Sequence, residues 1–161
     1  MIRKLSAAVL SCGVIVAAIL PTAPASAASS IRLFEAYGQY ALGAPNLTAG
    51  AAVTETVSGR DVIASPQPSG AVKWLFAADH SLCVAAVDGN EAVVVRDCTG
   101  LGTLWTVVAA SCGSCFKFKN NRESGLLNHA VYLTGANDGT DLYWAIGGAN
   151  GGFQVWQEQG P

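Results

Sequence analysis

Residues 81–105, SLCVAAVDGNEAVVVRDCTGLGTLW, contain the pattern on which the fold depends. Two runs of apolar and β-branched residues flank Gly89-Asn90, a dipeptide typical of tight turns between antiparallel strands. Cys83 and Cys98 lie at the outer ends of this predicted hairpin, so a disulfide between them would join its two arms. A Gly-containing loop then leads to Trp105.

Two altered copies of this pattern lie on either side of it. One runs from Val53 to Trp74 over 21 residues and the other from Leu133 to Trp156 over 23, against 21 from Val84 to Trp105. Short strands separated by turn signals predict an all-β domain. Three copies of one motif predict threefold pseudosymmetry, with the three closing tryptophans in a shared core. No segment shows a convincing helical period, and residues 120–125 are expected to form a turn.

The first 27 residues have the pattern of a secretory signal peptide. Arg3 and Lys4 precede a 16-residue uncharged apolar run, and Ala25-Ser26-Ala27 is an A-x-A cleavage signal. The run is short for a membrane span, so a retained anchor is the less favoured alternative. We therefore expect cleavage after Ala27, a single domain over residues 28–161, and a secreted, extracellular product without stable membrane insertion.

The charge of the predicted mature chain argues against a nucleic-acid partner. Without Arg3 and Lys4, seven basic residues remain against 11 acidic ones, a net charge of −4. Nucleic-acid-binding domains are usually basic, and anionic membranes attract basic surfaces. The net negative charge therefore argues against nucleic acid as a partner and gives no attraction to anionic membranes.

Four cysteines remain after the predicted cleavage, an even number that indicates two disulfides in an exported chain. Local spacing favours pairing Cys83 with Cys98 and Cys112 with Cys115. The Cys-x-x-Cys spacing of the second pair also occurs in redox and zinc motifs. However, a redox motif belongs at a helix start, and one such pair supplies only two zinc ligands. Strand-like segments flank this pair, so a structural disulfide in a hairpin is the favoured interpretation, with the redox and metal alternatives left open.

These residues resemble the ricin-B-type β-trefoil lectin family, whose repeat contains Gly-Lys-Cys-Leu-Asp, a hairpin, Leu-Trp-Asp-Cys-Asn-Gly and Gln-x-Trp. The matching segments are Leu82-Cys83-Val84, Arg96-Asp97-Cys98-Thr99-Gly100, Thr103-Leu104-Trp105 and Gln154-Val155-Trp156. The resemblance implies a β-trefoil of three pseudo-repeats that binds sugars. The intervals between Trp74, Trp105 and Trp156 are 31 and 51 residues, which predicts a loss near residues 76–80 and an insertion around residues 127–130.

The resemblance also indicates where a sugar would bind, because a lectin site needs a carboxylate, an aromatic ring and an amide. In the middle repeat, the family's aspartate, aromatic and asparagine positions fall on Ala85, Arg96 and Thr99, so that site has lost its chemistry. The third repeat keeps the most, although its aspartate position is Thr134. The candidate ligand-binding residues are Asn137, Asp138, Asp141, Tyr143, Trp144, Asn150 and Gln154. Trp144 in the core and Gln154 in a purely structural role are the alternatives for those two residues.

Nothing in the sequence indicates catalysis, a cofactor or a metal site. Asp79-His80-Ser81 contains the residue types of a catalytic triad, but neighbours along a strand point to opposite faces. The favoured function is therefore a secreted, non-catalytic carbohydrate-binding module. The first alternative is a secreted inhibitor or protein-interaction module on the same fold, with residues 66–69 as its contact loop. The second is a small β-sandwich that carries an apolar ligand.

Overall fold

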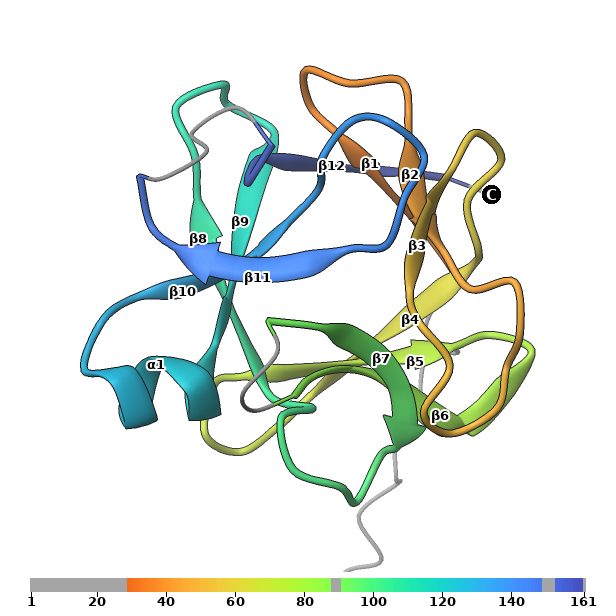
Figure 1. Ribbon diagram of the computed structural model, residues 1–161, viewed down its shortest axis with the longest axis horizontal. Coiled ribbons are helices and arrows are strands. Elements are labelled where there is room, and N and C mark those ends of the chain that lie inside the picture. The colour runs from red at the N-terminus through yellow and green to blue at the C-terminus, as the bar shows by residue number, and fades with distance from the viewer. Residues whose placement is uncertain (1–28, 88–90, 149–152, 161) are drawn as a thin grey trace, which may run out of the picture.

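The computed structural model describes residues 29–87, 91–148 and 153–160, which contain twelve strands and one short helix (Figure 1). The predicted signal peptide, the Gly89-Asn90 turn and Asn150 lie outside the described residues. The strands form three consecutive groups of four. The first group is β1 (Arg32–Glu35), β2 (Ala41–Gly43), β3 (Thr54–Thr56) and β4 (Val62–Pro66); the second is β5 (Val72–Phe76), β6 (Asp79–Ala86), β7 (Val93–Asp97) and β8 (Trp105–Ala109); the third is β9 (Cys115–Asn120), β10 (Val131–Thr134), β11 (Tyr143–Ile146) and β12 (Trp156–Gln159).

The first and last strands of each group form a closed, six-stranded antiparallel barrel. β1 pairs with β12, β12 with β9, β9 with β8, β8 with β5, and β5 with β4. Ile31, directly before β1, closes the ring by exchanging two 2.8 Å backbone hydrogen bonds with Val62 of β4. Closure leaves no free edge in the ring, which removes the aggregation risk of an open sheet.

The middle strands of each group form three hairpins, β2–β3, β6–β7 and β10–β11, that cap the barrel. A cyclic set of backbone hydrogen bonds joins the hairpins. Val53 donates to Val93 (2.9 Å), Val93 donates to Leu142 (3.3 Å), and Leu142 donates to Val53 (2.7 Å). Each residue therefore occupies the same place in its own repeat, and all three are buried. This arrangement confirms the predicted all-β, threefold pseudosymmetric β-trefoil and rules out the β-sandwich.

The pairing register corrects the predicted alignment of the first repeat. The last strand of each repeat begins with a buried residue that pairs with the first strand of the next repeat: Val62 with Phe76, Trp105 with Asn120, and Trp156 with Glu35. The counterpart of Trp105 and Trp156 is thus Val62, and the prediction that Trp74 shares their position is wrong. The 31-residue interval compared non-equivalent tryptophans, so it is no evidence for a loss near residues 76–80.

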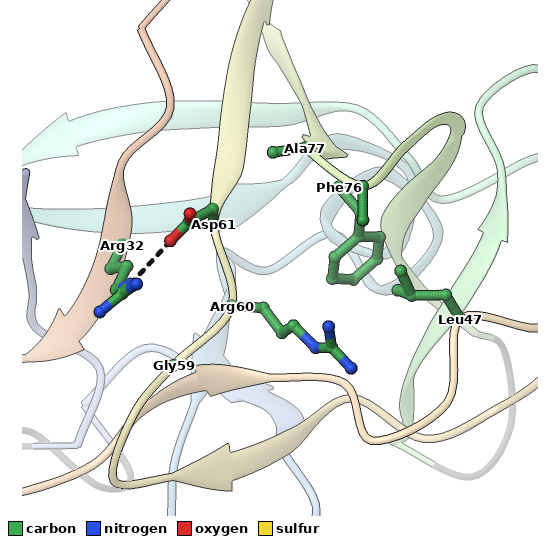
Figure 2. A pocket seen from close by; sticks show the side chains of 8 residues that line it. Arg32, Leu47, Gly59, Arg60, Asp61, Phe76 and Ala77 are labelled. Atoms are coloured by element: carbon green, nitrogen blue, oxygen red, sulfur yellow. Dashed lines mark hydrogen bonds and ion pairs between the residues drawn. The ribbon is translucent and has the colours of Figure 1, made fainter. Parts of the chain in front are cut away.

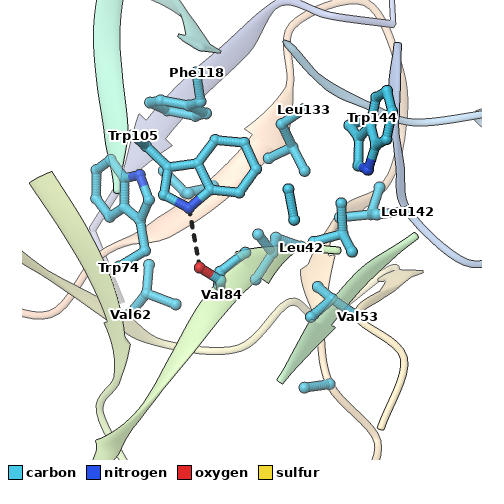
Figure 3. Close-up of a cluster of buried hydrophobic side chains, with 14 of the residues drawn as sticks. Leu42, Val53, Val62, Trp74, Val84, Trp105, Phe118, Leu133, Leu142 and Trp144 are labelled. Carbon is cyan, nitrogen blue, oxygen red and sulfur yellow. Dashed lines mark hydrogen bonds between the residues drawn. The ribbon is translucent and has the colours of Figure 1, made fainter. Parts of the chain in front are cut away.

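Trp74 belongs to a second layer of the core, together with Leu33 and Phe118, each two residues before the end of its strand. The Trp74 and Phe118 rings meet edge to face, with centroids 5.1 Å apart (Figure 3). Trp105 and Trp156 donate their indole N–H groups to the carbonyls of Val84 (2.9 Å) and Leu133 (3.3 Å). All the tryptophans named here are nearly inaccessible to solvent, so the prediction of a tryptophan-filled core is correct.

Helix α1 (Asn121–Leu127) replaces most of the turn that was expected over residues 120–125. The Asn120 side-chain oxygen accepts hydrogen bonds from the N–H groups of Arg122 and Glu123, both at 3.1 Å, and so caps the helix. Asn128 ends it in a left-handed conformation, with φ of 53°. With seven residues, α1 is too short to show a helical period, but Asn120 followed by Glu123 is a capping signal that the sequence does contain.

Both predicted disulfides are present. Cys83–Cys98 links β6 to the residue directly after β7, and Cys112–Cys115 closes the turn between β8 and β9. The second pair lies in a hairpin turn and not at a helix start, which is the arrangement expected of a structural disulfide. No helix in the described ranges has the length and apolarity needed to cross a bilayer.

Candidate functional site

The predicted third-repeat site divides into exposed and buried residues. Asp138 and Asp141 are exposed on the loop between β10 and β11, and Asn137 is half-buried there. The Asp138 carboxylate accepts hydrogen bonds from the backbone N–H (3.0 Å) and hydroxyl (2.6 Å) of Thr140, so one of its oxygens braces its own turn. Tyr143 is half-buried on β11 and bridges to Ala92 of the neighbouring hairpin.

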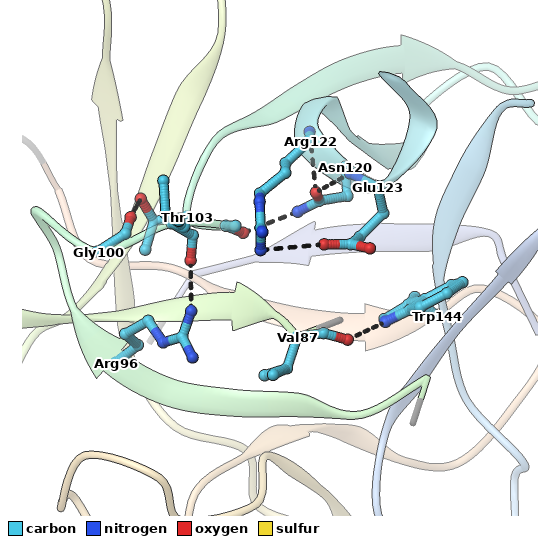
Figure 4. Close-up of polar contacts among 10 residues, drawn as sticks. Val87, Arg96, Gly100, Thr103, Asn120, Arg122, Glu123 and Trp144 are labelled. Carbon is cyan, nitrogen blue, oxygen red and sulfur yellow. Dashed lines mark hydrogen bonds and ion pairs between the residues drawn. The ribbon is translucent and has the colours of Figure 1, made fainter. Parts of the chain in front are cut away.

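Trp144 and Gln154 do not reach the surface. Trp144 is 6% exposed and donates its indole N–H to the carbonyl of Val87 at 2.9 Å (Figure 4). Gln154 is fully buried, and its amide nitrogen lies 3.3 Å from both the Thr134 hydroxyl and the Ile146 carbonyl. The core and structural alternatives for these two residues agree with this placement, because a sugar could neither stack on the buried Trp144 ring nor reach the Gln154 amide.

The register also places the family's sugar-binding positions in all three repeats. Ala85, at the family's aspartate position, is the counterpart of Gly43 and Thr134. Arg96, at the aromatic position, is the counterpart of Thr56 and Ala145. These three equivalent residues directly follow another equivalent set, Val95, Glu55 and Trp144. Neither position therefore carries a carboxylate or an aromatic ring in any repeat. In addition, Arg96 donates to the carbonyl of Leu101 at 2.9 Å (Figure 4).

A buried carboxylate, that of Glu55, accepts hydrogen bonds from the backbone of the β10–β11 loop. Glu55 of β3 is 3% exposed, and its two oxygens accept the backbone N–H groups of Asn137 (2.8 Å), Asp138 (2.9 Å) and Gly139 (2.9 Å). Three N–H donors satisfy a buried negative charge well. Glu55 therefore holds in place the loop to which the predicted ligand residues belong.

A second buried carboxyl group, that of Glu35 at the end of β1, lies beside Glu55. Both Glu35 oxygens are buried and accept no hydrogen bond from any residue that the structure describes. A Cβ atom at Gly135 would overlap Oε1 of both glutamates, so the two carboxyl groups meet at this glycine. Burial, the hydrogen bond to Glu55 and the negative charges of Glu55 and Asp138 raise the pKa of Glu35 to about 8.

Glu55 has the opposite titration behaviour. Burial by itself would raise its pKa, but the hydrogen bond with Glu35 and the three loop N–H groups lower it below the usual range. The pair thus shares one proton at neutral pH, held on Glu35 and donated to the Glu55 carboxylate. Sequence reasoning missed both residues, although strand alternation places Glu35 on the same face as Leu33, and Glu55 on the same face as Val53.

A surface pocket of about 490 Å³, which we call the tyrosine pocket, includes residues of the first and third repeats in its lining. Tyr37, which follows β1, is 63% exposed at this pocket. Lys117 of β9 places its ammonium 5.5 Å from the ring centroid of Tyr132 on β10, and Gly147 packs closely against the same ring. Its lining residues are Tyr37, Val108, Ala109, Ala110, Ser111, Lys117, Tyr132 and Val155.

A second pocket, of about 390 Å³, occupies the pseudosymmetric position one repeat away (Figure 2). The corresponding pairs, in register, are Arg32 with Lys117, Asp61 with Val155, and Ala78 with Tyr37. In this second pocket Arg32 binds Asp61 at 2.7 Å, and Arg60 donates to the carbonyl of Ala44 at 3.0 Å. The same position in the fold therefore holds an Arg–Asp ion pair in one repeat, and a lysine beside two tyrosines in another.

Among the described residues, no three His, Cys, Asp or Glu side chains cluster closely enough to share a metal ion.

The comparisons with known proteins bear on the fold. No protein-family profile matches the chain, and no curated protein sequence does.

Several solved structures are similar to this chain. A designed threefold symmetric protein, ThreeFoil, has a TM-score of 0.67 at 17% identity, over 80% of this chain and 96% of that one. A mosquitocidal holotoxin has a TM-score of 0.68 at 13% identity, and Cry35Ab1 has 0.63 at 11%, each over 83% of this chain. The matches span only 17% and 36% of those two longer chains. These similarities establish the β-trefoil fold.

Proposed function

We propose that this protein is an exported, non-catalytic module that binds carbohydrate in the tyrosine pocket. The observation that carries the proposal is the exposed side chain of Tyr37 at a pocket of about 490 Å³ that Tyr132 and Lys117 also line. Small-molecule sites commonly have volumes of about 300–1,000 Å³ and combine an apolar lining with a few polar groups.

Four of the lining residues have a defined role in this proposal. The exposed face of Tyr37 stacks on the apolar face of a sugar ring. Tyr132 has Lys117 and Gly147 packed against its ring, so it contributes its hydroxyl group more than its face. Lys117 and Ser111 add hydrogen-bond donors for sugar hydroxyls.

The charge of the pocket narrows the ligand class. Of the eight described lining residues, Lys117 alone carries a charge, so the pocket is weakly cationic. The chain as a whole is acidic. Neutral and acidic glycans are therefore the expected ligands, and cationic ones are disfavoured.

The test is a glycan array and an insoluble-polysaccharide pull-down with the wild type and Tyr37→Ala. Loss of one stacked ring costs about 1–1.5 kcal/mol, so binding should weaken about tenfold. Leu126→Ala is a matched control, because Leu126 has the same 63% exposure but lies on α1. Unchanged binding in Tyr37→Ala, or no binding by folded wild-type protein, would refute the proposal.

A second candidate function is inhibition of, or docking to, a protein through the loop between β4 and β5. The Gln67 side chain donates to the carbonyl of Ser65 at 2.9 Å, and the Gln67 backbone N–H donates to the carbonyl of Ala71 at 2.8 Å. Pro66, Pro68 and Ser69 are exposed on this braced loop. A preorganised loop binds at low entropic cost. Replacing residues 66–69 with glycine and serine should abolish this activity and leave glycan binding intact.

A further inference from the structure

We infer that the buried Glu35–Glu55 pair makes ligand binding in the tyrosine pocket dependent on pH, with binding strongest in neutral and acidic solution and progressively weaker in alkaline solution. The inference rests on the proposed function and adds its regulation. The structural basis is the position of the pair, which connects the turn that presents Tyr37 to the β10–β11 loop.

The turn at residues 36–40 is built directly on the carboxyl pair. Glu35 donates its backbone N–H to the carbonyl of Tyr40 at 2.9 Å, which closes the turn. A Cβ atom at Gly38 would overlap Glu35 Oε2 and would lie 2.7 Å from the Asn137 side-chain oxygen. Ala36 donates to the carbonyl of Val155, a lining residue of the tyrosine pocket, at 2.8 Å. The position of Tyr37 therefore depends on how the Glu35 side chain packs.

The same carboxyl pair holds the opposite loop. Glu55 accepts the three N–H groups of residues 137–139, and Gln39 of the turn donates its N–H to the Asn137 side chain at 3.4 Å. The turn and the loop are thus joined twice, once through the glutamates and once through Asn137. Gly135 packs against both carboxyl groups, and a side chain at this position would overlap them.

Because the charged groups that act on the pair are acidic, the two carboxyl groups are stabilised by a single bound proton. The charged groups that act on Glu35 are Glu55 on β3 and Asp138 on the β10–β11 loop, both acidic. The ring of Tyr40 also faces this loop, 3.5 Å from the position of a Cβ at Gly139. Glu35 accepts no hydrogen bond among the described residues, whereas Glu55 accepts three, so the proton resides on Glu35.

Loss of that proton places two like charges together in a buried site. Two adjacent buried carboxylates repel each other, and Glu35 would then lack any donor to stabilise its charge. The expected response is separation of the 36–40 turn from the β10–β11 loop, which displaces Tyr37 from the tyrosine pocket. If only the protonated form binds, apparent affinity at pH 9 is about tenfold weaker than at pH 6.

The first measurement needs no ligand. NMR of the free protein, with labelled glutamate carboxyl carbons and backbone amides, should show Glu35 titrating near pH 8, and the amides of Gly38, Asn137 and Gly139 shifting with the same midpoint. Titration of Glu35 near its ordinary pKa, or amides that do not follow it, would overturn the inference whether or not a glycan is found. Because this experiment uses the wild type, no folding defect can obscure it.

The second measurement uses the polysaccharide that the wild type retains in the pull-down. Binding should weaken about tenfold between pH 6 and pH 9 in the wild type and in Glu158→Gln, an exposed control on β12. Glu35→Gln, whose amide can still donate to Glu55, should bind at pH 9 as it does at pH 6. Equal pH dependence in the wild type and Glu35→Gln would overturn the inference while leaving the proposed function intact.

Discussion

Replacing Glu35 with glutamine should change how the stability of this protein depends on pH. The pKa of Glu35 is about 8 in the folded protein against an ordinary value of 4.5, so between these values the folded state holds a proton that the unfolded state releases. The stability that Glu35 contributes is therefore complete below pH 4.5, falls as pH rises, and is lost above pH 8. Glutamine carries no such proton, and its contribution is constant.

The expected magnitude follows from the size of the pKa change. Each pKa unit corresponds to about 1.4 kcal/mol, which gives an upper limit of about 5 kcal/mol for the loss between pH 4.5 and pH 8. Water entry and local opening reduce the effect of an ionised buried group, so we expect roughly 2–3 kcal/mol. Glu55 contributes in the opposite sense: its lowered pKa adds stability above pH 4.5 that is lost on further acidification.

The assay is urea unfolding followed by tryptophan fluorescence at pH 5, 7 and 9, for the wild type, Glu35→Gln and Glu158→Gln. The wild type and the Glu158 control should lose roughly 2–3 kcal/mol between pH 5 and pH 9, whereas Glu35→Gln should lose much less and become the most stable of the three at pH 9. A wild type with equal stability at pH 5 and pH 9 would refute the reasoning. So would a Glu35→Gln variant whose stability falls in parallel with that of the wild type.

Three further predictions concern stability and folding. Trp144→Ala should lower the free energy of unfolding by about 3–5 kcal/mol in urea melts, because the indole is buried and hydrogen-bonded to Val87; a change below 1 kcal/mol would contradict its core placement. Removing Cys83–Cys98 by double serine substitution should cost about 3 kcal/mol, and removing Cys112–Cys115 about 2 kcal/mol, since the first closes the longer loop; calorimetry of the two variants should preserve this order. Asn120→Ala should cost about 2–3 kcal/mol in urea melts, because it removes both the α1 cap and the buried hydrogen bond from the Asn120 amide nitrogen to the Gly102 carbonyl, and Asn120→Asp, which can restore only the cap, should not recover full stability; a loss below 1 kcal/mol in Asn120→Ala would contradict both roles.

The candidate site could be predicted only in part from the sequence. The exposed acidic residues Asp138 and Asp141 are on the surface, as expected of a ligand site, but Trp144 and Gln154 are inside. On β11, side chains alternate between the two faces, so choosing which aromatic residue points outward requires the strand register. The tyrosine pocket combines Tyr37 with Lys117 and Tyr132, from repeats at opposite ends of the chain, and no local pattern links them.

The sequence by itself determined the all-β class, the threefold repetition and both disulfides, because β-branched runs, turn residues and cysteine spacing act over short stretches of chain. Only the tertiary structure decided that Val62 and not Trp74 is the counterpart of Trp105, and that Glu35 and Glu55 share a buried site. Barrel closure pairs β1 with β12 and brings β3 beside the β10–β11 loop. Such contacts depend on the register across closed strands, and a one-residue shift would move every side chain to the opposite face.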